Sequence, residues 1–142
     1  MSRETVELVR AAWPRRMDVV EVVGDSAVPV DMASHLDPQV EVAFIANTPG
    51  IPELRYQGVE GLAEGWRDWL APYESYWLEI EDLIDAGEDD VVVPVRVSAR
   101  TRRDGVLIEH SPAAICTARD GKIVRVRFYL DRDQALEVAG VT

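Results

Sequence analysis

Hydrophobic residues in the first half of the chain recur at the spacing of α-helices. The first helix is indicated by four apolar residues at steps of three or four positions: Val6, Val9, Trp13 and Met17. Pro14 lacks a backbone N–H, so this helix should kink or restart there. A second, short helix is predicted at 30–36 and a third at 59–71. The third has one apolar face, made of Leu62, Trp66, Trp69 and Leu70.

The pattern changes to the period of β-strands at 39–45 and again after residue 75. The later strands are predicted at 76–86, 90–101, 106–118 and 122–131. A bulge is expected near 81–82, where strict alternation breaks. Asp104-Gly105 and Asp120-Gly121 are typical of the turns of β-hairpins. A short helix at 132–139 closes the chain.

A chain in which helices come first and an antiparallel meander follows is typical of an α+β domain. It is not typical of a parallel nucleotide-binding sheet. The 142 residues suit one domain over 1–142. We therefore expect three helices from the N-terminal half to pack on an antiparallel sheet, followed by a short C-terminal helix.

Two of the predicted strands have one apolar face and one mixed face. In 90–101 the apolar row is Val91, Val93, Val95, Val97 and Ala99. In 122–131 the apolar face is made of Val124, Val126, Phe128 and Leu130. The mixed face of this strand includes Arg125, Arg127, Tyr129 and Asp131. Two interpretations compete for the mixed face: it is plain solvent surface, or it lines a wet pocket while the apolar row packs in a dimer interface.

The overall charge argues against polyanionic partners. Twenty-six acidic and fifteen basic residues give a net charge of −11, which repels nucleic acids and anionic membranes. The charged start of the chain lacks the apolar core of a signal peptide, and no apolar run is long enough to span a bilayer. Cys116 is the only cysteine, so no internal disulfide is expected. These features predict a cytoplasmic protein.

Individual residues suggest little metal or cofactor chemistry. Two distant histidines and one cysteine have no metal-ligand spacing, and no phosphate-binding or dinucleotide motif occurs, so we predict neither metal nor cofactor. His110 is either a structural residue on an apolar face or a pocket acid or base. Cys116 is expected to be a small buried hydrophobic residue. Trp66 is either core or, on a helix that roofs a pocket, a ligand contact.

The segment 79–131 resembles the SnoaL-like branch of the nuclear-transport-factor-2-like superfamily. The residues that carry the resemblance are Leu83-Ile84-Asp85-Ala86-Gly87 before the valine-rich strand, Asp120-Gly121-Lys122-Ile123-Val124 before Phe128-Tyr129-Leu130-Asp131, and the helix segment Gln134-Ala135-Leu136-Glu137. The resemblance implies a cone in which helices close over a strongly bent sheet, often as a homodimer packed through the sheets. It favours the interpretation in which the mixed face lines a pocket for a small molecule.

Members of this superfamily include polyketide cyclases, ketosteroid isomerase and limonene epoxide hydrolase. The last is similar at Arg96-Val97-Ser98 and Tyr129-Leu130-Asp131, although Ser98 stands where that enzyme has an aspartate. The resemblance implies an acid/base role for Asp131 with Arg96 as its charge partner. The alternative for Asp131 is an ordinary N-cap of the helix that follows. Tyr129, Ser98, His110, Trp66 and Asn47 are the candidate ligand contacts.

Two functions remain open on this basis. The first is a small enzyme that acts on an apolar organic molecule by proton transfer, as an isomerase, dehydratase, cyclase or hydrolase without a cofactor. The second is a non-catalytic module of the same fold, which binds a ligand or assembles as a dimer.

Overall fold

The computed structural model describes residues 2–23, 30–46, 50, 53–87 and 89–141 of the chain. Its helices are α1 (Ser2–Ala12), α2 (Val19–Val23), α3 (Val30–Ala33), α4 (Gly58–Leu70) and α5 (Arg132–Ala139). Its strands are β1 (Arg16–Asp18), β2 (Leu36–Ile45), β3 (Leu54–Gln57), β4 (Tyr73–Ile80), β5 (Ile84–Asp85), β6 (Asp90–Thr101), β7 (Leu107–His110), β8 (Ala113–Arg119) and β9 (Lys122–Tyr129). The α+β class and the short C-terminal helix are confirmed. No helix among these residues is both long and apolar enough to cross a membrane.

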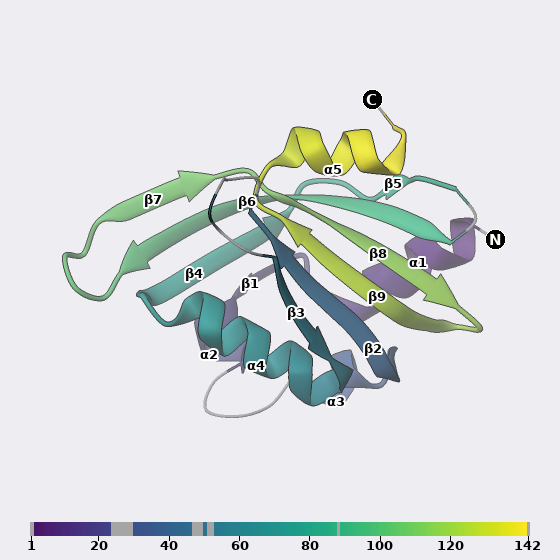
Figure 1. The fold of residues 1–142 in the computed structure, drawn as a ribbon, viewed down its shortest axis with the longest axis horizontal. Helices are drawn as coiled ribbons and strands as arrows, with labels where there is room; N and C mark the ends of the chain where they lie inside the picture. The colour runs from purple at the N-terminus through teal and green to yellow at the C-terminus, as the bar shows by residue number, and fades with distance from the viewer. Residues whose placement is uncertain (1, 24–29, 47–49, 51–52, 88, 142) are drawn as a thin grey trace.

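The strands form one sheet in the order β1-β4-β6-β8-β9-β2-β3, with β5 and β7 also paired to β6. The long strand β6 changes partners near its middle. Asp90–Pro94 pairs with β8, whereas the following residues pair with β4 and β7. Pro94 has no N–H to donate to a ladder, and it lies at this change of partner. The sheet therefore bends around β6 (Figure 1).

One pairing differs from the predicted antiparallel sheet. Strands β2 and β9 run parallel, with Val42 opposite Val126 and Phe44 opposite Phe128. The alternation of residues shows which side chains share a face, but it does not show the direction of the neighbouring strand. The sheet is thus mixed, although most of its pairings are antiparallel.

The ends of the first and last helices follow from single residues. Helix α1 stops at Ala12, before Pro14, and Met17 then lies in strand β1 instead of continuing the predicted helix. Helix α5 begins after Asp131, whose carboxylate accepts hydrogen bonds from the backbone N–H groups of Asp133 and Gln134. Gly140 follows this helix in the left-handed conformation at φ 74°, which glycine adopts without steric cost.

Helices cover the two faces of the sheet unequally. Buried residues of α1 and α4 pack with the odd-numbered row of β6 in the main hydrophobic cluster, whereas α5 packs on the opposite face over β6 and β8. Figure 1 shows α5 on the other side of the sheet from α4. We call the face under α4 the inner face and the face under α5 the outer face.

This arrangement reverses the pocket assignment favoured by the sequence. The apolar row Val91, Val93, Val95, Val97 and Ala99 is buried on the inner face, so it is not a dimer interface. The mixed face, with Arg96, Arg125 and Arg127, points outward. The physical reason is that the apolar faces of α1 and α4 need an apolar partner, and this row supplies it.

Candidate active site

A cavity of about 60 Å³ remains between the helices and the inner face of the sheet. Its floor follows the strand register: Leu78 of β4 lies opposite Val97 of β6, which lies opposite His110 of β7. Val93, Ala114 and Phe128 form a second row across β6, β8 and β9. The register of a strongly bent sheet therefore brings residues from five separate strands around one space.

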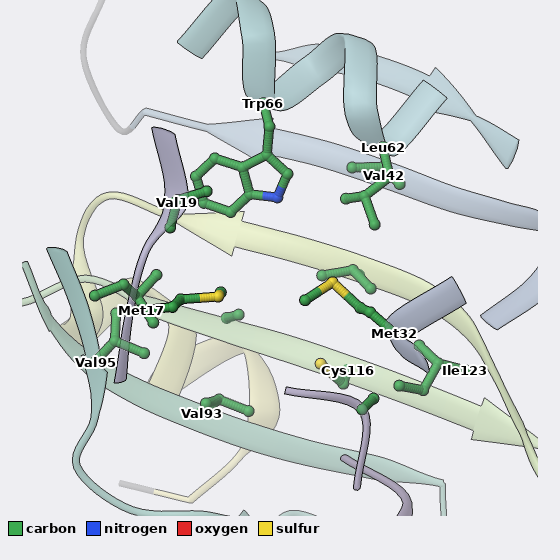
Figure 2. Close-up of a cluster of buried hydrophobic side chains, with 14 of the residues drawn as sticks. Met17, Val19, Met32, Val42, Leu62, Trp66, Val93, Val95, Cys116 and Ile123 are labelled. Atoms are coloured by element: carbon green, nitrogen blue, oxygen red, sulfur yellow. The ribbon is translucent and has the colours of Figure 1, made fainter. Parts of the chain in front are cut away.

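Aromatic rings form the wall of the cavity that faces α4. Phe44 stacks on Phe128 with ring centroids 4.8 Å apart and on Trp69 at 5.5 Å. Trp66 packs edge-on against Phe128 at 4.8 Å and is 6% exposed. Figure 2 shows the Trp66 indole pointing from α4 toward the sheet, with Met17 and Val95 beyond it. These ring contacts form the wall of the cavity on the side of α4.

Few polar groups line the cavity. His110 is half-buried, and burial lowers its pKa below the ordinary value of 6.5. Burial also raises the pKa of Tyr76 to about 12 and that of Cys116 to about 12. At neutral pH the imidazole is therefore unprotonated, while the phenol and the thiol keep their protons. Cys116 is fully buried, as predicted for a small hydrophobic residue.

His110 and Tyr76 are neighbours at one end of the cavity, with ring centroids 6.3 Å apart. The Tyr76 hydroxyl oxygen accepts a hydrogen bond from Nε1 of Trp69 at 3.2 Å. Because this bond uses only the oxygen of the hydroxyl group, its hydrogen can be donated to an occupant of the cavity. The site thus combines a neutral base with a neutral hydrogen-bond donor.

Asp131 and Arg96 do not line the cavity. Asp131 is exposed and caps α5, at 3.0 Å from the N–H of Asp133 and 3.4 Å from that of Gln134. Arg96 lies on the outer face, where Glu81 is 3.9 Å away and the arginine side chain is 64% exposed. Both residues were predicted to lie at a pocket because the sequence pattern and the family resemblance favoured a pocket on the mixed face.

The remaining predicted contacts divide between the two faces. Trp66 and His110 line the cavity. Tyr129 is 4% exposed at the end of β9, where it borders the cavity and also packs with α5 residues on the outer face. Ser98 is half-buried in the outward row of β6, between Trp77 and Glu109. Asn47 lies outside the described residues.

Tyr76 is the polar cavity residue that the sequence did not single out. It shares a face of β4 with Leu78 and Ile80, so its position in the pattern predicts only a core residue. Its partner Trp69 comes from a different element, α4. A contact between a helix residue and a strand residue leaves no sign in the spacing of hydrophobic residues along either element.

The described part of the chain holds no cluster of three or more histidine, cysteine, aspartate or glutamate side chains placed to bind a metal ion.

These features define a class of protein: a small α+β domain in which helices close over a bent sheet around an interior cavity. The family model of the SnoaL-like domain matches residues 19–126. The chain belongs to the SnoaL-like domain family.

Solved structures of similar fold cover nearly the whole chain. TerC, crystallised with polyporic acid, is 18% identical with a TM-score of 0.67, over 96% of this chain and 98% of that one. A nuclear-transport-factor-2-like protein from Burkholderia thailandensis is 22% identical with a TM-score of 0.69, over 96% and 95%. A ketosteroid isomerase-like protein from Catenulispora acidiphila, in complex with trimethylamine, is 15% identical with a TM-score of 0.60, over 96% and 94%. At such identities the likeness shows the fold alone. No curated protein gives a significant match.

Proposed function

We propose that this chain binds a compact, largely apolar organic molecule in the inner cavity, with His110 and Tyr76 as its polar contacts. The observation that carries the proposal is the cavity itself. Protein interiors are normally close-packed, so a space of about 60 Å³ among these side chains leaves room for an occupant. Two proteins of similar fold were solved with small organic molecules, polyporic acid and trimethylamine, which is consistent with this use of the fold.

The size and lining of the cavity restrict the occupant. An apolar cavity of roughly 150 Å³ holds benzene, and this one is about 60 Å³. A single ring therefore needs more than twice this volume, so its binding requires Phe44, Trp66 and their neighbours to move apart. The described residues that line the walls include no arginine, lysine or carboxylate, so a charged group would lose its hydration without compensation. A neutral molecule with one polar substituent fits best, and p-cresol is a suitable probe.

Filling the cavity should abolish this binding. Ala114 lies on the cavity floor between Val93 and Phe128 and is 8% exposed. Ala114→Leu places an isobutyl group in the empty space, so the Kd for p-cresol, measured by calorimetry, should rise at least about tenfold, equivalent to 1.4 kcal/mol. Ala71→Leu makes the same change at an exposed position and should leave the Kd unchanged. If Ala114→Leu is too large to fold, Ala114→Val tests the same point. Undiminished p-cresol binding by a folded cavity variant would contradict the proposal.

A second candidate function is proton transfer within the same cavity. The observation that favours it is the pairing of His110, kept unprotonated by burial, with Tyr76, kept protonated by burial. Such a pair can act on a carbonyl compound: the imidazole takes a proton from the carbon next to the carbonyl, while Tyr76 donates a hydrogen bond to the carbonyl oxygen. Exchange of the α-hydrogens of cyclohexanone for deuterium in D2O, followed by NMR, detects this step whatever the natural product is.

The acid/base role of Asp131, with Arg96 as charge partner, is the rival proposal for the same chemistry. Because Asp131 caps α5, Asp131→Ala should lower the free energy of unfolding by about 1 kcal/mol, whereas Asp131→Asn should change it by only a few tenths, since asparagine is an equally good N-cap. Neither variant should slow deuterium exchange once it is folded. Urea unfolding and the exchange assay together test this. Loss of exchange in Asp131→Asn at unchanged stability would support the rival role.

The predicted homodimer stays a prediction. Its only remaining surface on the sheet is the outer face beside α5, because α1 and α4 cover the inner face.

A further inference from the structure

A groove of about 620 Å³ lies on the outer face of the sheet, across β3, β2 and β9. It is separated from the inner cavity by the sheet itself. Its floor is Ala43, which lies opposite Arg55 on one side and Arg127 on the other. Neighbouring strands are about 4.8 Å apart, so a methyl group between two arginines leaves a hollow rimmed by guanidinium groups.

The charges around this hollow are not balanced. Arg125 pairs with Glu41 at 3.3 Å, and Arg55 forms an ion pair with Glu53. Arg127 has no ion pair within the described part of the chain, and its Nε is buried without a hydrogen-bond partner. A buried donor without a partner costs free energy, and few remain in native structures. In a chain with net charge −11, a half-buried arginine without a carboxylate indicates an anionic partner that is not part of the fold.

We propose that the groove binds an organic monocarboxylate, whose carboxylate pairs with Arg127. Among the described residues, three guanidinium groups and two carboxylates line the groove, so one positive charge remains to be compensated, which favours a monoanion over a phosphate dianion. Arginine binds carboxylates through parallel N–H···O hydrogen bonds, which the terminal Nη groups of Arg127 can donate. Ile45 and Tyr129 supply an apolar wall for the body of the ligand.

The size of the groove suits a small-molecule ligand. The groove volume lies within the roughly 300–1,000 Å³ typical of ligand sites. Helix α5 packs on the same face over β6, β8 and β9. A single-ring carboxylate can enter the hollow over Ala43.

The test is a titration of the full ¹⁵N-labelled chain with benzoate at constant ionic strength, observed at the arginine Nε–H resonances. Benzoate should shift the Arg127 Nε–H signal saturably, and Arg127→Gln should weaken binding at least tenfold. Arg96→Gln removes another outer-face arginine, outside the groove, and should leave the affinity unchanged. Uncharged benzamide should bind at least tenfold more weakly than benzoate. Melting temperatures of both variants establish that each is folded.

Five results would overturn the proposal. Chemical shifts that rise linearly with the benzoate concentration would show a general charge effect. An equal loss of affinity in Arg127→Gln and Arg96→Gln would show the same. Equal binding of benzamide would remove the role of the carboxylate, and tighter binding of phenyl phosphate would remove the preference for a monoanion. A wild-type dimer in sedimentation that Arg127→Gln dissociates would assign Arg127 to a partner chain's carboxylate instead.

Discussion

Replacement of His110 by glutamine should slow deuterium exchange into cyclohexanone by about 10²–10⁴-fold, the usual contribution of a general base. Glutamine keeps a polar side chain of similar reach, but it cannot accept the proton. His110 is the cavity residue suited to this role at neutral pH because burial holds its pKa below 6.5. The measurement is the NMR exchange rate, compared with that of Tyr76→Phe, which should keep the base and lose only the hydrogen bond to the carbonyl.

The pH profile provides the control for this substitution. In the wild-type protein, exchange should fall as the pH drops through the lowered pKa of His110 and should be level across neutral pH. Folding lowers this pKa, so the unfolded chain binds the proton more readily, and stability should also decrease as the pH falls below about 6.5. Rates are therefore compared only where both proteins are folded. An acid limb that persists unchanged in His110→Gln would assign the base to another group.

Trp66→Ala should lower the free energy of unfolding by about 3–5 kcal/mol, a large share of the roughly 5–15 kcal/mol of a typical domain. Trp66 is 6% exposed and contacts the rings of Phe44, Tyr76 and Phe128. Its removal enlarges the existing cavity, so the neighbours lose contacts that they cannot replace by collapse. Urea unfolding, with the midpoint and slope fitted together, measures the loss.

Trp77 supplies a matched comparison within the same chain. It is 38% exposed, and its main described contact is the guanidinium of Arg16, 4.3 Å above the ring. Trp77→Ala should therefore cost about 1 kcal/mol or less. If Trp66→Ala does not fold, Trp66→Phe preserves the comparison with a smaller loss. Equal effects at the two positions would mean that Trp66 is not part of a packed wall.

Most of the architecture could be predicted from local patterns. The strand 90–101 and the helix 132–139 have the predicted bounds, because an unbroken apolar row at odd positions defines the first and Asp131 with Gly140 defines the ends of the second. The predicted strand at 106–118 is interrupted in the structure between β7 and β8, around Pro112. Strand β3 was not predicted, since four residues are too few to show a period.

The site was harder to predict because it depends on which face of the sheet the helices cover. Alternation shows that Val95 and Arg96 face opposite ways, but it does not show which of them faces inward. The resemblance then placed Asp131 and Arg96 at a pocket, whereas the structure places both on the outside. His110 was identified as a candidate from its chemistry, and Trp66 from its position on a helix expected to roof a pocket; both line the cavity.

The most direct test of the central claim is to locate bound p-cresol by NMR in protein with ¹³C-labelled methyl groups. Binding in the inner cavity predicts intermolecular nuclear Overhauser effects from the ligand ring to the methyl groups of Val93, Val95 and Ala114, which line the cavity floor. Effects confined to exposed methyl groups such as those of Val106 and Leu107, with none to the cavity floor, would contradict the claim.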